Sequence, residues 1–117
     1  MKQTTSLFYH LEPKIMAEIH TYETKNLALL ATSYLESKQG STNFLDQLVA
    51  HVCLICGHLQ STNLLFKLFE QVVRNPRYVT ESNQILTAIM KRQDTFKARQ
   101  IYSLLMSLKV SSIGSQD

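Results

Sequence analysis

Residues 80–108, TESNQILTAIMKRQDTFKARQIYSLLMSL, contain two apolar-patterned segments separated by a short polar interruption. The second segment has apolar residues at helical spacing, which places them together on one face of an α-helix. These residues are Ala98, Ile101, Tyr102 and Leu105. The same pattern occurs 33 residues earlier, and more weakly once before that, at Leu65, Leu68, Phe69 and Val72 and at Ala31, Tyr34 and Leu35. A period of this length in helical sequence predicts stacked helical hairpins.

The composition agrees with a helical protein of one domain. The chain has 117 residues, of which 44% are hydrophobic and 18% charged, and it contains only three Gly and two Pro, too few turn residues for a β-sandwich. We therefore predict an all-α fold of about six helices in three antiparallel hairpins, either α-solenoid-like or a compact six-helix bundle. Residues 1–110 form the single domain in this prediction, and residues 111–117 form a flexible C-terminal tail.

Start and stop signals divide the chain into six predicted helices, at residues 12–20, 22–38, 44–58, 62–75, 80–90 and 94–108. Pro13 is expected in the first turn of the first helix, and Gly40 is expected to close the second. Ser61 or Thr62 can cap the fourth helix, and Asp94 can cap the sixth. Short connections predict that the first helix pairs with the second, the third with the fourth and the fifth with the sixth.

Charge is distributed unevenly along the chain. Residues 1–58 hold four Lys and five Asp or Glu, whereas residues 59–117 hold eight Lys or Arg and four acids. A basic half can attract an acidic protein surface or a phosphate backbone. The longest uncharged apolar stretch, residues 48–59, is too short to span a bilayer, so we expect no membrane association.

Two cysteines lie between two histidines in the segment His51-Val-Cys53-Leu-Ile-Cys56-Gly-His58, and these residue types are common zinc ligands. On a helix, however, the cysteines and histidines lie on nearly opposite sides, so one ion cannot reach both sets. We therefore expect both cysteines to be reduced, with Cys56 packed as a small hydrophobic residue and Cys53 beside the apolar stripe, and we predict no metal and no cofactor. Reduced cysteines are typical of an intracellular protein, which we expect to be cytoplasmic, with a mitochondrial location as the alternative.

Signatures of catalysis are missing. The three glycines are scattered, so no Gly-rich phosphate loop is present, and the carboxylates lack the spacing that would bring two of them together on one helix. We predict that the protein is not an enzyme and has no small-molecule substrate.

Residues 80–105 resemble a pentatricopeptide-type helical repeat. The positions that carry the resemblance are Asn83, Ile85, Leu86, Lys91, Ala98, Ile101, Tyr102 and Leu105. Tetratricopeptide repeats share Ala98 and Tyr102 of this pattern. The pentatricopeptide resemblance implies binding of single-stranded RNA, one base per repeat, through a polar residue near the start of the first helix, here Asn83 or Gln84.

These patterns leave three functions open. The first is a non-enzymatic interaction module that binds a protein partner in a groove between hairpins, with Phe66, Arg74, Arg77 and Tyr78 as exposed anchors. The second is RNA binding by the basic half, through Asn83, Gln84, Lys91, Arg92, Lys97 and Arg99. The third is a six-helix signalling module of the death-fold type. A three-hairpin array needs its end faces covered, so we also expect self-association or a protein complex.

Overall fold

The computed structural model describes the backbone of residues 2–110 and the side chains of residues 7–109. Six α-helices fill this range: α1 (Lys2–Glu18), α2 (Thr24–Glu36), α3 (Thr42–Ile55), α4 (Thr62–Val73), α5 (Val79–Met90) and α6 (Ala98–Val110). Short 3-10 turns connect several of them, at Ile19–Thr21, Cys56–His58, Pro76–Tyr78 and Gln93–Thr95. The predicted all-α, six-helix fold is confirmed, and the predicted tail lies outside the described residues.

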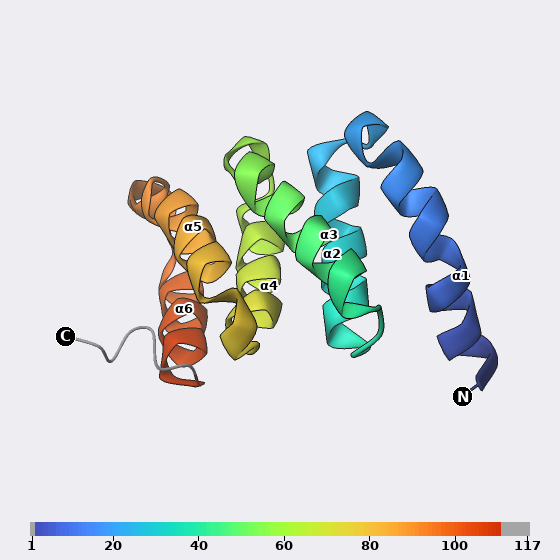
Figure 1. Ribbon diagram of the computed structural model, residues 1–117. Helices are drawn as coiled ribbons and strands as arrows, with labels where there is room; N and C mark the ends of the chain where they lie inside the picture. The colour runs from blue at the N-terminus through green and yellow to red at the C-terminus, as the bar shows by residue number, and fades with distance from the viewer. Residues whose placement is uncertain (1, 111–117) are drawn as a thin grey trace.

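The helices form a row two layers deep (Figure 1). Helices α2, α4 and α6 lie side by side in one layer, and α1, α3 and α5 lie in the other. Consecutive helices run in opposite directions, so the helices within each layer are parallel. The described chain measures 40 × 27 × 23 Å, with α1 and α6 at the two ends of its long axis.

The closely packed consecutive pairs are α2 with α3 and α4 with α5. The predicted pairing of first with second, third with fourth and fifth with sixth helix is therefore shifted by one helix. Ala28 and Ala31 are fully buried on α2, where their small side chains allow neighbouring helices to approach closely. The α2–α3 turn is equally tight: at Gly40, where φ is +100°, an added Cβ would lie 3.0 Å from the Leu45 side chain.

Helix α4 lies at the centre of the row and contacts α2, α5 and α6. Its apolar face is inaccessible to solvent, since Leu65, Leu68 and Val72 are fully buried. The Ser61 hydroxyl caps this helix by accepting a hydrogen bond from the Leu64 N–H at 3.1 Å, as the sequence predicts. The hydrophobic core therefore centres on the earlier copy of the repeated pattern.

The helices at the two ends of the row, α1 and α6, start at different residues from those predicted. Helix α1 starts at Lys2 instead of residue 12, so Pro13 lies inside the helix and not in its first turn. Two contacts hold the part of α1 that precedes Pro13: the Tyr34 hydroxyl donates to the Phe8 carbonyl at 2.6 Å, and the Glu12 carboxylate accepts from the Ser41 hydroxyl at 2.7 Å.

Helix α6 begins at Ala98, four residues later than predicted. Asp94 does not cap it, because Gln93–Thr95 form a separate 3-10 turn. The first turn of α6 is closed instead by the Gln100 side chain, whose Oε1 accepts from the Lys97 N–H at 2.8 Å. Phe96, two residues before the start of this helix, packs edge-on against Phe66.

Candidate partner-binding surface

The apolar face of α6 is open to solvent. Ile101, Tyr102 and Leu105 are 45%, 64% and 58% exposed. Their counterparts 33 residues earlier in α4 are no more than 1% exposed: Leu68, Phe69 and Val72. The same pattern of apolar residues is therefore core in one helix and surface in the other.

The difference follows from the position of α6 at the end of the row. Helix α3 covers α2 and helix α5 covers α4, but no helix within the described part of the chain covers α6 in the same way. Helix α6 packs on α4 through another side, where Leu104 and Ser107 are buried. Its apolar face thus lacks the helix that the two preceding members of its layer have.

Two exposed apolar residues of α5 extend this surface. At 100° per residue, Val79 and Met90 lie on the same side of α5. They are 47% and 43% exposed. We call Val79, Met90, Ile101, Tyr102, Leu105 and Met106 the α6 end surface.

An apolar groove lies at the other end of the row, between α1 and α2. It has a volume of about 450 Å³, and its apolar walls are formed by Leu11, Ile15, Tyr22, Leu29 and Leu30. Polar groups border it: the Glu18 carboxylate accepts from the Tyr22 hydroxyl at 3.0 Å and from the Lys14 ammonium at 3.3 Å. The two ends of the row therefore both present apolar side chains to solvent.

The predicted anchors Arg77 and Tyr78 are engaged within the protein. Arg77 makes a bidentate ion pair with Asp46, at 2.8 and 2.6 Å, and the Tyr78 hydroxyl donates to the same carboxylate at 2.9 Å. The hydrogen bonds from Arg77 lower the pKa of Asp46 to about 2, and burial raises the pKa of Tyr78. Tyr78 is buried, so the expectation that it is exposed is wrong. These residues join α3 to the start of α5.

The other two predicted anchors lie apart from each other. Phe66 is half-buried against Phe96, with 5.2 Å between the ring centroids and the rings nearly perpendicular. Arg74 is exposed and borders a polar groove between α2 and α4, together with Glu36 and Glu70. The four anchors therefore do not form one surface.

The residues predicted to contact RNA are also dispersed. Asn83 and Gln84 are exposed on α5, and Lys91, Lys97 and Arg99 are exposed around the start of α6. Of the six, Arg99 alone borders the groove of about 290 Å³ between α4 and α6, where it is joined by Lys67.

Arg92 differs from the others, because it is half-buried and bound to the backbone. Its guanidinium donates to the carbonyls of Gly57, at 3.2 Å, and Leu59. It also approaches the Thr62 hydroxyl, at 3.4 Å. Arg92 therefore fastens the α3–α4 connection to the end of α5, and its N–H groups are already used within the protein.

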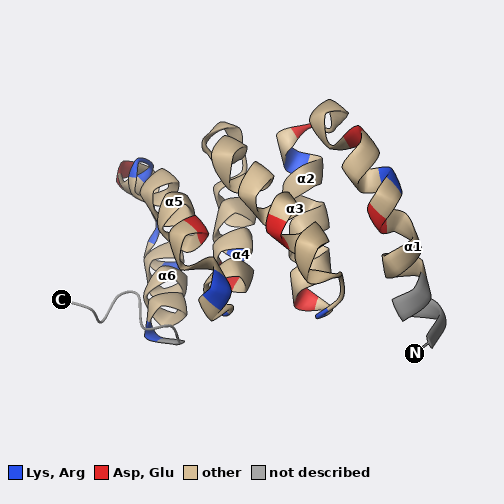
Figure 2. Cartoon of the chain, viewed as in Figure 1, with Lys and Arg blue, Asp and Glu red and all other residues tan. Residues whose placement is uncertain are grey.

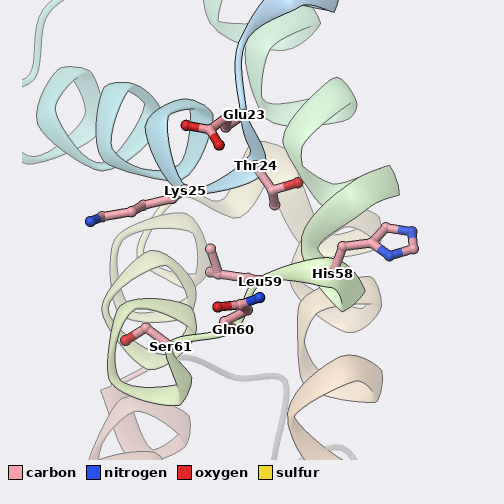
Figure 3. A pocket seen from close by; sticks show the side chains of 7 residues that line it. All are labelled: Glu23, Thr24, Lys25, His58, Leu59, Gln60 and Ser61. Atoms are coloured by element: carbon pink, nitrogen blue, oxygen red, sulfur yellow. The ribbon is translucent and has the colours of Figure 1, made fainter.

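A larger polar groove lies between the starts of α2 and α4 (Figure 3). Its volume is about 580 Å³, and it is lined by Glu23, Thr24, Lys25, His58, Leu59, Gln60 and Ser61. The side chains of Lys25 and His58 extend away from each other in Figure 3. The polar groups of this groove thus do not converge on one point, as a small-molecule site requires.

Cys56 packs in the core as predicted, and Cys53, which was expected beside the apolar stripe, is buried there as well. Cys53 and Cys56 are both buried, and burial raises the pKa of each thiol, which keeps it protonated. His51 contacts His20 instead of the cysteines, with 5.1 Å between the ring centroids. Among the described residues, no three His, Cys, Asp or Glu side chains are grouped closely enough to hold a metal ion.

Comparisons with known proteins identify no relative of this chain. Within residues 2–110, no helix is long and apolar enough to cross a membrane. The resemblance of residues 80–105 to helical repeats stays a prediction. No family model matches the chain, and no curated protein or solved structure is significantly similar to it.

Proposed function

We propose that this protein is a helical interaction module, without catalytic activity, that binds an α-helix of another protein molecule on the α6 end surface. One observation supports this proposal above all others. The apolar pattern that is buried on α4, where α2, α5 and α6 surround it, is repeated on α6, and there it is exposed. The partner helix would take the place on α6 that α5 takes on α4.

The chemistry of the surface favours a helix as the ligand. Apolar residues at positions 98, 101, 102 and 105 form a stripe along α6, and such a stripe pairs with the apolar face of an amphipathic helix. Burying a large apolar side chain stabilises a complex by about 1.5–3 kcal/mol. Tyr102 and Leu105 are the most exposed members of the stripe, so they would contribute most to binding.

RNA binding has weaker support as an alternative. Two of the four arginines, Arg77 and Arg92, are held by groups of the protein itself. The remaining cations lie on several elements, and Asn83 and Gln84 are not beside the groove that Arg99 and Lys67 border. An apolar surface offers nothing to a phosphate backbone, whose recognition depends on cations.

A photoreactive amino acid at position 102 tests the proposal. We expect p-benzoylphenylalanine in place of Tyr102 to form a covalent adduct with a protein when cells that make the variant are irradiated. The same amino acid in place of Leu54, which is 73% exposed on α3, is the matched control and should give no such adduct. Adducts to RNA alone, or equal protein adducts from both positions, would contradict the proposal.

A further inference from the structure

We infer that the protein assembles head to tail with itself, so that α6 of one copy occupies the α1/α2 groove of the next copy. The inference rests on the proposed function, because it identifies the molecule that covers the α6 end surface. It also gives an occupant to the groove lined by Leu11, Tyr22 and Leu29. Each interface would then join the α6 end surface of one copy to the α1/α2 groove of the next.

Each of the two layers has room for one further helix, and these two positions lie at opposite ends of the row. In the layer of α2, α4 and α6, the groove beside α2 is where a preceding helix would lie. The three helices have 13, 12 and 13 residues, so α6 has the length of a member of this layer. In the other layer, α1 of the next copy would continue the row after α5 and cover α6, as α5 covers α4.

The surfaces that would meet are both apolar. Large apolar residues that are more than a third exposed gather at the two ends of the row, and Leu54 is the exception among the described side chains. At one end are Leu7, Tyr9, Leu11 and Leu29, and at the other is the α6 end surface. Assembly in register would remove both sets from water, which is the main driving force of association.

Charge selects head-to-tail contact over contact between two identical ends. Residues 91–110 hold five Lys or Arg and one Asp, and α6 itself has no acidic residue (Figure 2). Residues 2–36 hold three Lys and four Glu. Two α6 end surfaces facing each other would bring Lys97 and Lys109 of both copies together, whereas at the α1/α2 groove the charge of Lys14 is balanced by its ion pair with Glu18.

Because the helices within a layer run parallel, head-to-tail assembly would also create one specific contact between charged residues. Since α6 would run parallel to α2 of the next copy, its first turn would lie near the connection between α1 and α2. Lys97, just before α6, would therefore approach Glu18 and Glu23, which are located at that connection. An interface of this type joins two different surfaces, so it continues from copy to copy until a ring closes or a filament grows.

Two surface substitutions test the inference when they are used together. Leu29→Glu places a charge in the groove, and Tyr102→Glu places one on the α6 end surface; both side chains are partly exposed, so the fold should persist, which circular dichroism verifies. We expect the wild-type mass in sedimentation velocity to rise with protein concentration beyond a dimer. Each variant alone should associate at least tenfold more weakly.

The mixture of the two variants gives the decisive result. Each variant keeps one intact end, so an equimolar mixture should form a dimer of one copy of each and nothing larger. Leu54→Glu is the matched control and should assemble like the wild type. A dimer that only Tyr102→Glu disrupts would overturn head-to-tail assembly and indicate contact between identical ends.

A wild-type protein that stays monomeric at every concentration would also overturn the inference. The proposed function would survive that result if position 102 still formed adducts with a different protein in cells. If those adducts were absent as well, the inference of self-assembly and the proposed function would both be contradicted. The two experiments therefore separate failure of self-association from failure of the binding surface.

Discussion

At the scale of single residues, Asp46 links two segments that are far apart in the sequence, α3 and the turn Pro76–Tyr78. It lies on α3, and its carboxylate accepts hydrogen bonds from Arg77 and from the buried Tyr78, 31 and 32 residues later. The sequence suggested Arg77 and Tyr78 as exposed anchors, because Arg and Tyr are common at interfaces. It could not show their partner, since the pairing depends on how α3 and α5 are placed beside each other.

The acid stability of the protein should report this contact. The pKa of Asp46 is about 2 in the folded protein and near 3.8 in an unfolded chain, so the unfolded state binds more protons between these values. The contribution of Asp46 to stability is therefore complete above about pH 5 and is lost as the pH falls toward 2.

Urea unfolding followed by circular dichroism measures this effect. The difference in unfolding free energy between the wild type and Asp46→Asn should stay constant from pH 6 to about pH 5 and then shrink toward pH 2. In Arg77→Gln, which removes the main cause of the lowered pKa, the folded and unfolded pKa values of Asp46 lie closer together, so this pH-dependent loss should be smaller. A difference between wild type and Asp46→Asn that stays constant over this range would show that the contact does not stabilise the fold.

At the scale of the elements, helical spacing predicted most of the helices but not which of them pair. The repeated pattern correctly placed apolar faces on α4 and α6. It could not distinguish the buried face of α4 from the exposed face of α6, because periodicity shows which residues share a face and not what covers that face. The later start of α6 coincides with the Gln100 cap, and the shifted pairing depends on contacts between helices that periodicity does not encode.

Matched truncations in α4 and α6 test this difference. Phe69→Ala should lower the free energy of unfolding by about 3–5 kcal/mol, because it leaves a cavity in the core. Tyr102→Ala, 33 residues later, should change the stability of the monomer by less than about 1 kcal/mol, since the ring is largely in water. Thermal unfolding at a concentration where the protein is monomeric gives both values. Similar losses for the two variants would mean that α6 is covered within one molecule.

At the scale of the whole molecule, the row has a packed centre and two apolar ends. The sequence predicted the number of helices, a single domain over residues 1–110 and a need to cover the end faces. It did not show the α1/α2 groove, because α1 begins ten residues before its predicted start and because Leu11 and Leu29 lie on different helices. The helical pattern at Leu7 and Leu11 is the signal that could have revealed the longer helix.

Hydroxyl-radical footprinting tests most directly whether the α6 end surface is a binding surface. Oxidation of Tyr102, Leu105 and Met106 would be compared between dilute purified protein and intact cells, with Leu54 as the reference side chain. We predict that the three α6 residues are protected several-fold in cells, while Leu54 reacts equally in both settings. Equal reactivity of Tyr102, Leu105 and Met106 in cells and in dilute solution would show that nothing covers this surface, and would contradict the proposed function.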